Sequence, residues 1–234
     1  MPLIEIDGVS HVYGQGRNRR VVLRDLSLTL TERRIGVIGA NGSGKSTFAR
    51  LLNGLVVPDA GRVEVDGLDT RREGAAVRRR VGFVFADPDA QVVMPTVAED
   101  VAFSLRRLRL GRDDVSARVA GVLERFGLAG HADHPAHLLS GGQKQLLALA
   151  SVLVTEPAVL VCDEPTTLLD LRNAREVGAL VDALPQQVVL VTHHLDLLAG
   201  WDRVLVLDDG RLVHDGPPEE AVAAYRSLMG AVPR

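Results

Sequence analysis

The chain has 234 residues, 46% of them hydrophobic and 3% aromatic, and a formal net charge of −3 at pH 7. This length and composition fit one well-packed globular domain and exclude a disordered tail, and the slightly acidic balance gives a nucleic-acid partner no electrostatic support. The single cysteine, Cys162, excludes an internal disulfide and favours a reducing compartment. No apolar run approaches the roughly 20 residues that span a bilayer, and the N-terminus lacks the features of a secretory signal, so we expect a cytoplasmic protein.

The apolar spacing divides the chain into a strand-rich start, a helical middle and a return to strands. Short strands are predicted at residues 3–7, 25–30, 34–38 and 62–66. From residue 95 to residue 154 the spacing is that of helices, which predicts a helical insertion. Nearly all-apolar strands follow at residues 158–162, 187–192 and within 202–216, with helical segments between the first two and a last helix after residue 217. Such strands, alternating with helices, predict a parallel sheet covered on both faces.

The strand at 34–38 leads into the pattern G-x-x-x-x-G-K-S at residues 39–46, and a predicted helix follows that ends near Gly54. Glycines let the backbone N–H groups of such a loop turn toward a phosphate, and the helix N-terminus adds its dipole. Lys45 would then reach the β- and γ-phosphates of a nucleotide, and the hydroxyl of Ser46 would hold Mg²⁺. The residues expected to bind the phosphates are Gly39, Ala40, Asn41, Gly42, Ser43, Gly44, Lys45, Ser46 and Thr47.

Two later strands end in residues suited to phosphate chemistry. One apolar strand ends in Asp163 and Glu164, at the carboxyl edge of the predicted sheet. There Asp163 is placed to hold Mg²⁺ and Glu164 to polarise the attacking water. The next strand ends in two histidines. His193 could contact the γ-phosphate, while His194 should point elsewhere because side chains alternate along a strand.

A second anion-binding end is predicted at residues 138–153. Ser140 suits an N-cap, two glycines follow it, and an amphipathic helix begins there. The hydroxyl, the glycine N–H groups and the helix dipole favour a second phosphate contact. One nucleotide cannot easily use both sites of one chain if the helical insertion holds this one far from the phosphate loop. Two chains packed head to tail can, with Ser140, Gly141, Gly142 and Gln143 of one chain completing the site of the other.

Taken together, these segments resemble the ATPase subunit of ATP-binding cassette (ABC) transporters over nearly the whole chain. The phosphate loop, the signature LSGGQ at residues 139–143, and Asp163, Glu164 and His193 carry the resemblance. It implies an α/β fold of the P-loop NTPase class, with a RecA-like parallel sheet core, an N-terminal antiparallel β subdomain and an inserted α-helical subdomain. The whole chain, residues 1–234, would be a single ABC ATP-binding domain. The core and β subdomain would occupy residues 1–85 and 156–234, and the Q-loop and helical subdomain with the signature residues 86–155.

The same resemblance assigns two further residues. Asp170, which ends the segment TTLLD, matches the D-loop of the family, and Tyr13 falls where an aromatic ring would stack on adenine. Without the resemblance, Tyr13 would be read as an ordinary loop tyrosine. The family implies hydrolysis of MgATP at two sites of a dimer, for which a homodimer suffices, at the cytoplasmic face of the cell membrane.

The pattern FxxPDxQxxxPTVxEDVAF at residues 85–103 is most similar to ATPase subunits of energy-coupling factor (ECF) importers, which take up vitamins and transition-metal ions. Within that group, the segments DEPTTLLDLRNAR and VVMPT look closest to subunits of biotin uptake systems. This resemblance implies a transmembrane coupling protein and a substrate-binding membrane protein as partners, and no nucleic acid. The alternatives are an ECF transporter for cobalt, nickel or another vitamin, a soluble ABC ATPase without a transport role, a small-molecule P-loop kinase, and a non-hydrolysing nucleotide sensor.

The segment that leads into the helical insertion departs from the family. Its loop normally carries a glutamine that meets Mg²⁺ or water, yet Ala86 follows the strand run here. Either Gln91 substitutes as a metal ligand, or water completes the metal shell. Asp87 and Asp89 favour a turn over a metal site, so the segment is predicted to be a hinge. Residues 92–96 offer an apolar surface, either for a membrane partner or for burial inside the helical subdomain.

Two other clusters have less specific patterns. His131, His134 and His137 stand three residues apart, a spacing that suits zinc, but Pro135 interrupts any helix and no cysteine is near, which favours a solvated loop. The arginines at residues 71–80 and 106–109 fit a solvated face, or a contact with an anionic membrane surface or an acidic partner.

Overall fold

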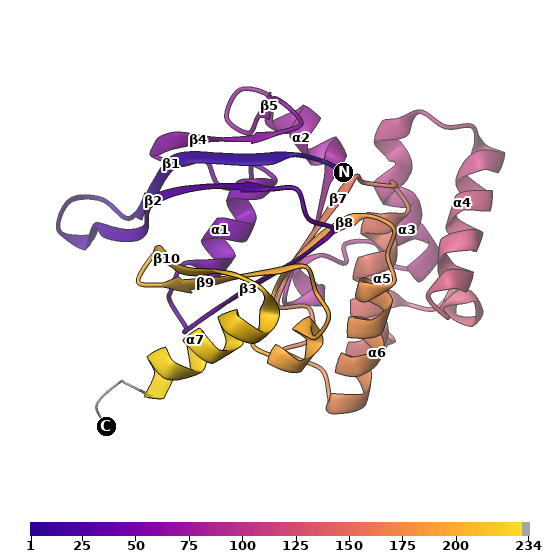
Figure 1. The fold of residues 1–234 in the computed structure, drawn as a ribbon. Coiled ribbons are helices and arrows are strands. Elements are labelled where there is room, and N and C mark those ends of the chain that lie inside the picture. The colour runs from indigo at the N-terminus through magenta and orange to yellow at the C-terminus, as the bar shows by residue number, and fades with distance from the viewer. Residues whose placement is uncertain (231–234) are drawn as a thin grey trace.

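Two β-sheets form the frame of the protein (Figure 1). The structure is a computed structural model and describes residues 1–230. The first sheet has the strand order β2-β1-β4-β5, and its neighbouring strands are antiparallel. Its members are β1 (Ile4–Tyr13), β2 (Arg20–Leu30), β4 (Ala60–Val65) and β5 (Leu68–Asp69).

The second sheet has the order β10-β9-β3-β8-β7-β6, and its neighbours are parallel except for the hairpin of β9 with β10. Its members are β3 (Arg34–Gly39), β6 (Val81–Val84), β7 (Val159–Asp163), β8 (Gln187–Val191), β9 (Arg203–Asp208) and β10 (Arg211–Gly216). The predicted fold class, a P-loop NTPase core of parallel strands with an N-terminal antiparallel sheet, is confirmed.

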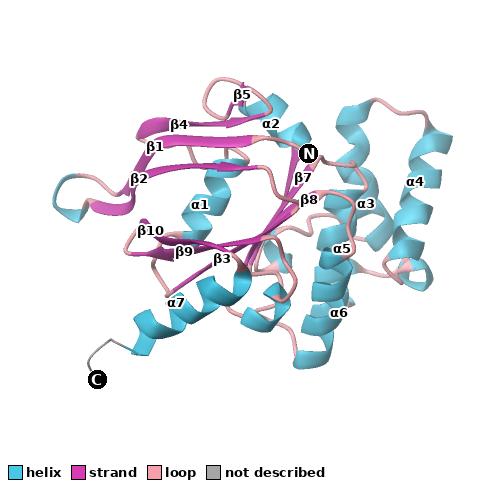
Figure 2. Ribbon diagram, in the orientation of Figure 1, coloured by secondary structure: helices cyan, strands magenta, loops and turns pink. Residues whose placement is uncertain are grey.

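Helices pack between and around the two sheets (Figure 2). Helix α1 contacts strands of both sheets and fills the space between them. Helices α3, α4 and α5 pack on one another at the right of Figure 1, and α6 packs on α5. The helices are α1 (Lys45–Leu52), α2 (Gly74–Arg80), α3 (Val97–Leu105), α4 (Arg112–Arg125), α5 (Gly141–Leu153), α6 (Leu171–Asp182) and α7 (Pro218–Gly230).

The six-stranded sheet is covered on both faces because its strands alternate between two hydrophobic cores. In β8, Val188 and Leu190 belong to the core shared with α5 and α6, whereas Val189 and Val191 belong to the core that contains Phe48 of α1. Burying one such side chain stabilises the fold by about 1.5–3 kcal/mol. The sheet is therefore a rigid base for the loops at its carboxyl edge.

Strands β1 and β2 extend further than the sequence predicted. Tyr13, expected in a loop, is the last residue of β1 and pairs with Arg20, the first residue of β2. Irregular pairing between Ile6 and Val12 interrupts the apolar alternation on which a strand prediction depends. Helix α2 was not predicted, because its seven residues bury only Val77 and so carry no apolar stripe.

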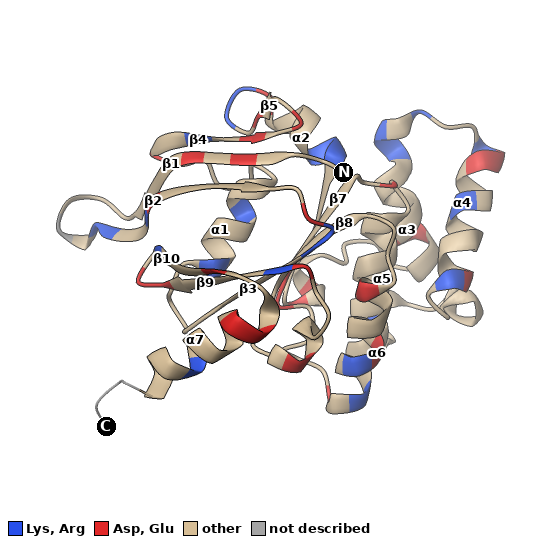
Figure 3. Cartoon of the chain, viewed as in Figure 1, with Lys and Arg blue, Asp and Glu red and all other residues tan. Residues whose placement is uncertain are grey.

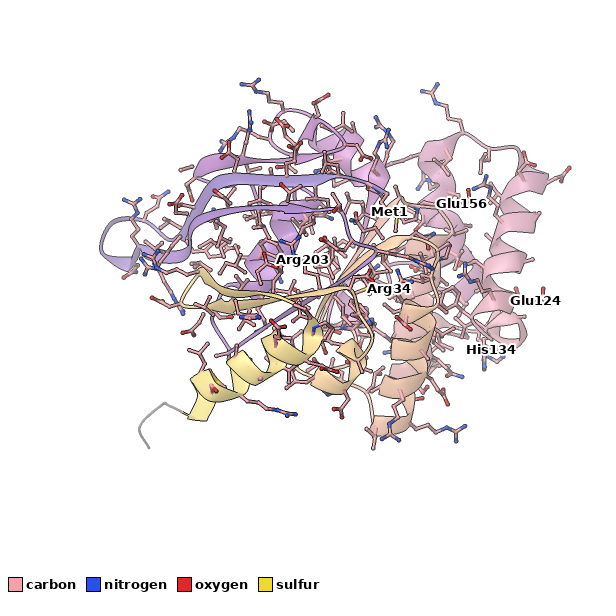
Figure 4. The ribbon with its side chains drawn as sticks, viewed as in Figure 1. Met1, Arg34, Glu124, His134, Glu156 and Arg203 are labelled. Atoms are coloured by element: carbon pink, nitrogen blue, oxygen red, sulfur yellow. The ribbon has the colours of Figure 1, made fainter. Side chains whose placement is uncertain are left out.

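Arg203 joins the two sheets (Figure 4). Its guanidinium donates to both carboxylate oxygens of Asp215 at 2.6 Å, to the carbonyl of Thr29 at 2.8 Å and to Glu32 Oε1 at 3.0 Å. The bidentate bond with Asp215 raises the pKa of Arg203. Because Thr29 lies in β2 and Asp215 in β10, this residue fixes the antiparallel sheet against the edge of the larger one.

Candidate active site

The phosphate loop connects β3 to α1 and depends on glycine. Gly39, Gly42 and Gly44 have φ angles of +152°, +78° and +104°. A Cβ atom on Gly39 would lie 2.1 Å from the carbonyl oxygen of Leu207, so no other residue fits there. Helix α1 begins at Lys45 without a side-chain cap, and the N–H groups of a first helical turn have no acceptor within the helix. A glycine loop in front of such a helix end favours an anion.

Lys45 places a positive charge in this loop. The residue is 4% exposed, and its Nζ donates to the carbonyl oxygens of Gly39 and Ala40 at 2.9 and 3.0 Å. Burial lowers the pKa of Lys45, and the carboxylates of Glu164 and Asp163 oppose that effect. Lys45 is therefore a desolvated cation bonded to two neutral carbonyls, and a phosphate would be a stronger partner for it.

Ser46 and Asp163 meet at the carboxyl edge of the sheet. The Ser46 hydroxyl donates to Asp163 Oδ1 at 2.9 Å, and Arg50 Nη2 lies 3.8 Å from Asp163 Oδ2. Burial raises the pKa of the Asp163 carboxyl, while the hydrogen bond from Ser46 and the charge of Arg50 act in the opposite direction. A hydroxyl and a carboxylate oxygen at this separation are the hard ligands that Mg²⁺ prefers, so the pair fits a divalent cation.

Glu164 and His193 face each other across two neighbouring strands. His193 Nε2 lies 2.8 Å from Glu164 Oε1, and the Thr167 hydroxyl donates to Glu164 Oε2 at 3.0 Å. The backbone of Glu164 has φ +55°, in the left-handed region, and its N–H donates to a carbonyl of β8 at 2.9 Å. Both carboxylate oxygens are thus oriented while keeping lone pairs for a water molecule. His194 turns toward Thr166, with its Nδ1 3.2 Å from the Thr166 hydroxyl.

A hollow of about 280 Å³ brings the phosphate loop, Tyr13 and Glu164 together. Tyr13 is 42% exposed at its rim, and Arg20 stands opposite it on β2. A Cβ atom on Gly42 would lie 3.2 Å from Arg20 Nη2, so the guanidinium reaches the phosphate loop. Sequence reasoning missed Arg20, because only the full length of β1 and β2 brings it there. The hollow is lined by Tyr13, Arg20, Val22, Asn41, Gly42, Gly44, Lys45, Ser46, Thr47 and Glu164.

The signature residues do not line this hollow. Ser140 caps α5: the Gln143 N–H donates to Ser140 Oγ at 3.3 Å, and the Ser140 N–H donates to Gln143 Oε1 at 2.9 Å. Asp170 caps α6 by accepting the N–H of Asn173 at 2.8 Å. Gly142 packs on Asn173 so closely that a Cβ atom would lie 2.9 Å from Asn173 Cγ. The structure therefore brings the signature beside the predicted D-loop, but not beside the phosphate loop of the same chain.

Gln91 bonds to backbone groups and not to the oxygens of Ser46 and Asp163. Its Oε1 accepts the N–H of Phe85 at 3.1 Å, and its Nε2 lies 3.4 Å from the carbonyl oxygens of Phe83 and Ala148. The amide thus closes the end of β6 and ties it to α5. These contacts would have to open before Gln91 could take up the metal-binding role.

The segment around Gln91 forms the predicted turn. The Asp89 N–H donates to Asp87 Oδ1 at 3.0 Å, and Lys144 Nζ pairs with Asp89 Oδ1 at 2.6 Å. Further on, the buried carboxylate of Asp100 accepts the N–H of Val93 and the Ser151 hydroxyl, both at 2.8 Å. Because Lys144 and Ser151 lie on α5, the segment is bonded to the helix that carries the signature.

Comparisons with known proteins identify the family. The profile of the family described as ABC transporter matches residues 23–167, which include the phosphate loop, the signature and the Asp163–Glu164 pair. The chain belongs to the ABC transporter family. This ABC protein is 51% identical over 209 residues to the biotin transport ATP-binding protein BioM of Rhizobium etli, a match that covers 89% of this chain and 93% of BioM.

A second relative of this ABC protein is the energy-coupling factor transporter ATP-binding protein EcfA1 of Symbiobacterium thermophilum. The two are 44% identical over 234 residues, covering 95% of this chain and 82% of EcfA1. Among solved structures, the dimeric ATP-binding cassette MJ0796, in a post-hydrolysis state bound to ADP and Pi, matches with a TM-score of 0.82 and 26% identity. That match covers 92% of this chain and 98% of MJ0796. The family and its activity, ATP hydrolysis coupled to transport, agree with the sequence prediction.

Proposed function

We propose that this ABC protein is the MgATP-hydrolysing subunit of an ECF importer whose cargo is biotin. The ECF assignment is supported by the pattern at residues 85–103 and by the 44% identity to EcfA1. The biotin assignment is supported by the 51% identity to BioM. Cobalt, nickel and other vitamins are the alternative cargoes, because the residues that contact cargo lie in partner proteins.

The hollow offers a counterpart for each part of MgATP. Tyr13 would stack on adenine, while Lys45 and the N–H groups of the phosphate loop bind the β- and γ-phosphates. Ser46 and Asp163 would hold Mg²⁺, which supplies charge neutralisation on these phosphates when bound. Glu164 orients the attacking water and accepts its proton, and His193 keeps Glu164 in place beside the γ-phosphate.

One observation carries the proposal of a shared site: a single chain holds two anion-binding groups that do not line the same hollow. A second copy placed head to tail would bring its Ser140, Gly141, Gly142 and Gln143 to the phosphates, with its Asp170 beside them. The dimeric state of the MJ0796 cassette supports this arrangement. Both halves of the site are intact in this chain, so a homodimer suffices.

The membrane partners would dock where the helical part meets the sheet. Val93 is 63% exposed, and beside it Met94 and Phe103 line an apolar hollow of about 460 Å³. A neighbouring hollow of about 580 Å³ is lined by four arginines from α2 and from the 3₁₀ turn that follows α3: Arg78, Arg79, Arg106 and Arg107. Figure 3 shows basic residues on both segments. A cytoplasmic segment with apolar and acidic side chains would fit both hollows.

This surface suits a transmembrane coupling protein that also holds a substrate-binding membrane protein. We place this chain at the cytoplasmic face of the membrane, attached through that partner. Within residues 1–230, no helix combines the length and the apolar character that crossing a membrane requires.

A mixed dimer tests the shared site, with Lys45→Ala and Ser140→Arg placed either on the same subunit or on different subunits. If the sites are shared, separating the two substitutions leaves one site intact, and about half of the ATPase activity should remain. Placing both on one subunit inactivates both sites. Unshared sites predict the reverse, so normal activity from the wild-type partner of a doubly substituted subunit would refute the shared arrangement.

The cargo is tested separately, with the native membrane complex reconstituted in vesicles. ATP-dependent uptake of labelled biotin should occur with the wild-type chain and be lost with Lys45→Ala. Uptake of cobalt or nickel in place of biotin would favour the alternative cargoes.

A further inference from the structure

Two of the three histidines that precede the signature form a hydrogen-bonded chain that ends on the signature glutamine. His131 Nε2 lies 3.1 Å from Gln143 Nε2, and His131 Nδ1 lies 2.7 Å from His134 Nδ1. The two rings meet edge to face, with centroids 4.8 Å apart. His131 is half-buried in the 3₁₀ turn Ala129–His131, whereas His134 is exposed in the loop beyond α4 (Figure 4).

The positions of the hydrogen atoms in this chain follow from the capping of α5. Gln143 Oε1 accepts the N–H of Ser140 at 2.9 Å, so the amide group that faces His131 is the NH₂. His131 Nε2 must then accept a hydrogen bond, which puts the ring hydrogen on Nδ1. His134 Nδ1 must accept in turn, so its ring hydrogen is on Nε2. The chain is complete only when both imidazoles are neutral.

We propose that His131 is a positioning residue for the signature motif, and that it acts only while His131 and His134 are both uncharged. The proposal rests on the proposed function, in which Ser140 and Gln143 serve the phosphates of a second copy. The neutral His131 ring accepts from Gln143 and thereby keeps its amide turned toward the Ser140 N–H. The His131–Gln143 bond thus fixes the orientation of the first turn of α5.

Protonation of either ring would place two hydrogen-bond donors against each other, with no acceptor between them. A proton on His131 Nε2 would face the Gln143 NH₂, and a proton on His134 Nδ1 would face the His131 Nδ1–H. Gln143 could relieve the first conflict only by rotating its amide, which would break its bond to the Ser140 N–H. The signature should therefore lose its fixed orientation when either imidazole gains a proton.

The charged groups around the two rings do not compensate such a proton. On the segments that pack against this loop, Glu99 bonds to Thr96 and Lys144 pairs with Asp89. Asp100 bonds to Ser151, and Arg125 at the end of α4 lies over the ring of Phe126. Asp133, between the two histidines, makes no ion pair with either ring in the described part of the chain, and neither does Glu124.

Two substitutions at residue 131 test the role of the acceptor. His131→Leu fills similar space but cannot accept from Gln143, so the turnover rate at pH 8 should fall about threefold to tenfold, the effect of losing one hydrogen bond. His131→Gln offers a carbonyl oxygen to the Gln143 amide and should restore most of the turnover. It should also lose activity less steeply than the wild type between pH 8 and pH 6. Wild-type turnover in His131→Leu, or an unchanged pH profile in His131→Gln, would overturn the proposal.

His137→Leu is the matched control. It lies in the same loop, is exposed, and its ring makes no hydrogen bond to residues 1–230, so its turnover and pH profile should match those of the wild type. If His137→Leu lost as much activity as His131→Leu, the loop would matter only for its packing and the positioning role would be wrong.

The same variants are compared for ATP-driven dimerisation in a hydrolysis-deficient Glu164→Gln background. Binding of ATP to the monomer should be unaffected by His131→Leu, whereas the dimer dissociation constant should rise threefold to tenfold. Equal dimerisation of the His131→Leu and parent proteins would refute the role of His131 alone. Failure of the parent protein to dimerise with ATP would refute the shared site itself.

Discussion

His193 Nε2 lies 2.8 Å from Glu164 Oε1, and the contact joins the ends of β7 and β8, two parallel strands buried at every position. Glu164 follows β7 directly and His193 stands two residues beyond β8, so the rigid sheet limits the distance between the two side chains. The sheet thus holds a proton acceptor, the Glu164 carboxylate, against the His193 imidazole. In the proposed function, this pair activates the attacking water.

Glu164→Gln should bind ATP with an affinity within about twofold of the wild type but hydrolyse it about 10²–10⁴-fold more slowly, because the amide cannot accept the proton of water. His193→Ala should have a smaller effect, since Thr167 still orients the other carboxylate oxygen. Single-turnover measurements of phosphate release would show both. Near-normal turnover in Glu164→Gln would remove Glu164 from the role of base.

Lys45→Met should raise the melting temperature of the nucleotide-free protein and abolish its response to ATP. Burial lowers the pKa of Lys45 in the folded state, so the unfolded chain binds more protons between that value and the ordinary 10.5. Stability therefore increases as the pH rises through that window, and below the window the penalty for the buried charge is fully present. Methionine removes this charge.

Thermal unfolding with and without ATP measures both effects. At an ATP concentration 100 times the dissociation constant, the wild type should gain about 2.7 kcal/mol, or several degrees, and Lys45→Met should gain nothing. A lower melting temperature for the nucleotide-free variant would show that the two carbonyl contacts of Lys45 outweigh its burial.

Arg20→Ala should raise the dissociation constant of ATP about threefold to tenfold, because an exposed guanidinium that reaches the phosphate loop can contact the phosphates. The effect should weaken at high salt and be absent for adenosine, which has no phosphate. Isothermal titration with both ligands at two salt concentrations would measure it. Arg19→Ala is the control, as Arg19 is exposed and does not line the hollow. Equal loss of ATP and adenosine affinity in Arg20→Ala would place Arg20 at the base or ribose instead.

Asp100→Ala should lower the free energy of unfolding by about 2–4 kcal/mol, since the buried carboxylate satisfies two backbone N–H groups and the Ser151 hydroxyl. Asp100→Asn keeps one acceptor oxygen and should be less damaging. Urea unfolding gives both values, with Glu124→Ala on the exposed face of α4 expected to change stability by less than about 0.5 kcal/mol. A loss below about 1 kcal/mol in Asp100→Ala would mean that water replaces the carboxylate.

The parts of the site that could be predicted are those formed by residues that are consecutive in the sequence. Lys45 and Ser46 open α1 directly after the glycine loop, so the loop carbonyls that Lys45 contacts, those of Gly39 and Ala40, are its neighbours along the chain. Ser140 was predicted as an N-cap for the same reason, and the structure shows that cap. The alternation of β8 between two cores was also predictable, because a run without polar residues fits only a sheet covered on both faces.

Three contacts between distant segments could not be predicted, although the contact of Ser46 with Asp163 could, because a parallel sheet brings its strand ends to one edge. Arg20 reaches the phosphate loop because β2 pairs with the end of β1. The bulges in β1 interrupt the apolar alternation from which this pairing could have been predicted. Gln91 was considered as a metal ligand, whereas its Oε1 accepts the N–H of Phe85. No local sequence pattern indicates this hydrogen bond. The bond between His131 and Gln143 spans a loop whose path depends on the packing of the turn Ala129–His131 against α4.

Lys144, the residue after the signature, helps couple the segment that follows β6 to helix α5. Three side-chain contacts fix the segment that follows β6 to α5. They are the ion pair of Lys144 with Asp89, the hydrogen bond of Ser151 with Asp100, and the contact of Gln91 with the carbonyl of Ala148. A membrane protein that pushed on Val93 would therefore displace this segment together with α5, whose N-cap is Ser140. In the proposed dimer, that force would be transmitted along α5 to the interface between the two copies.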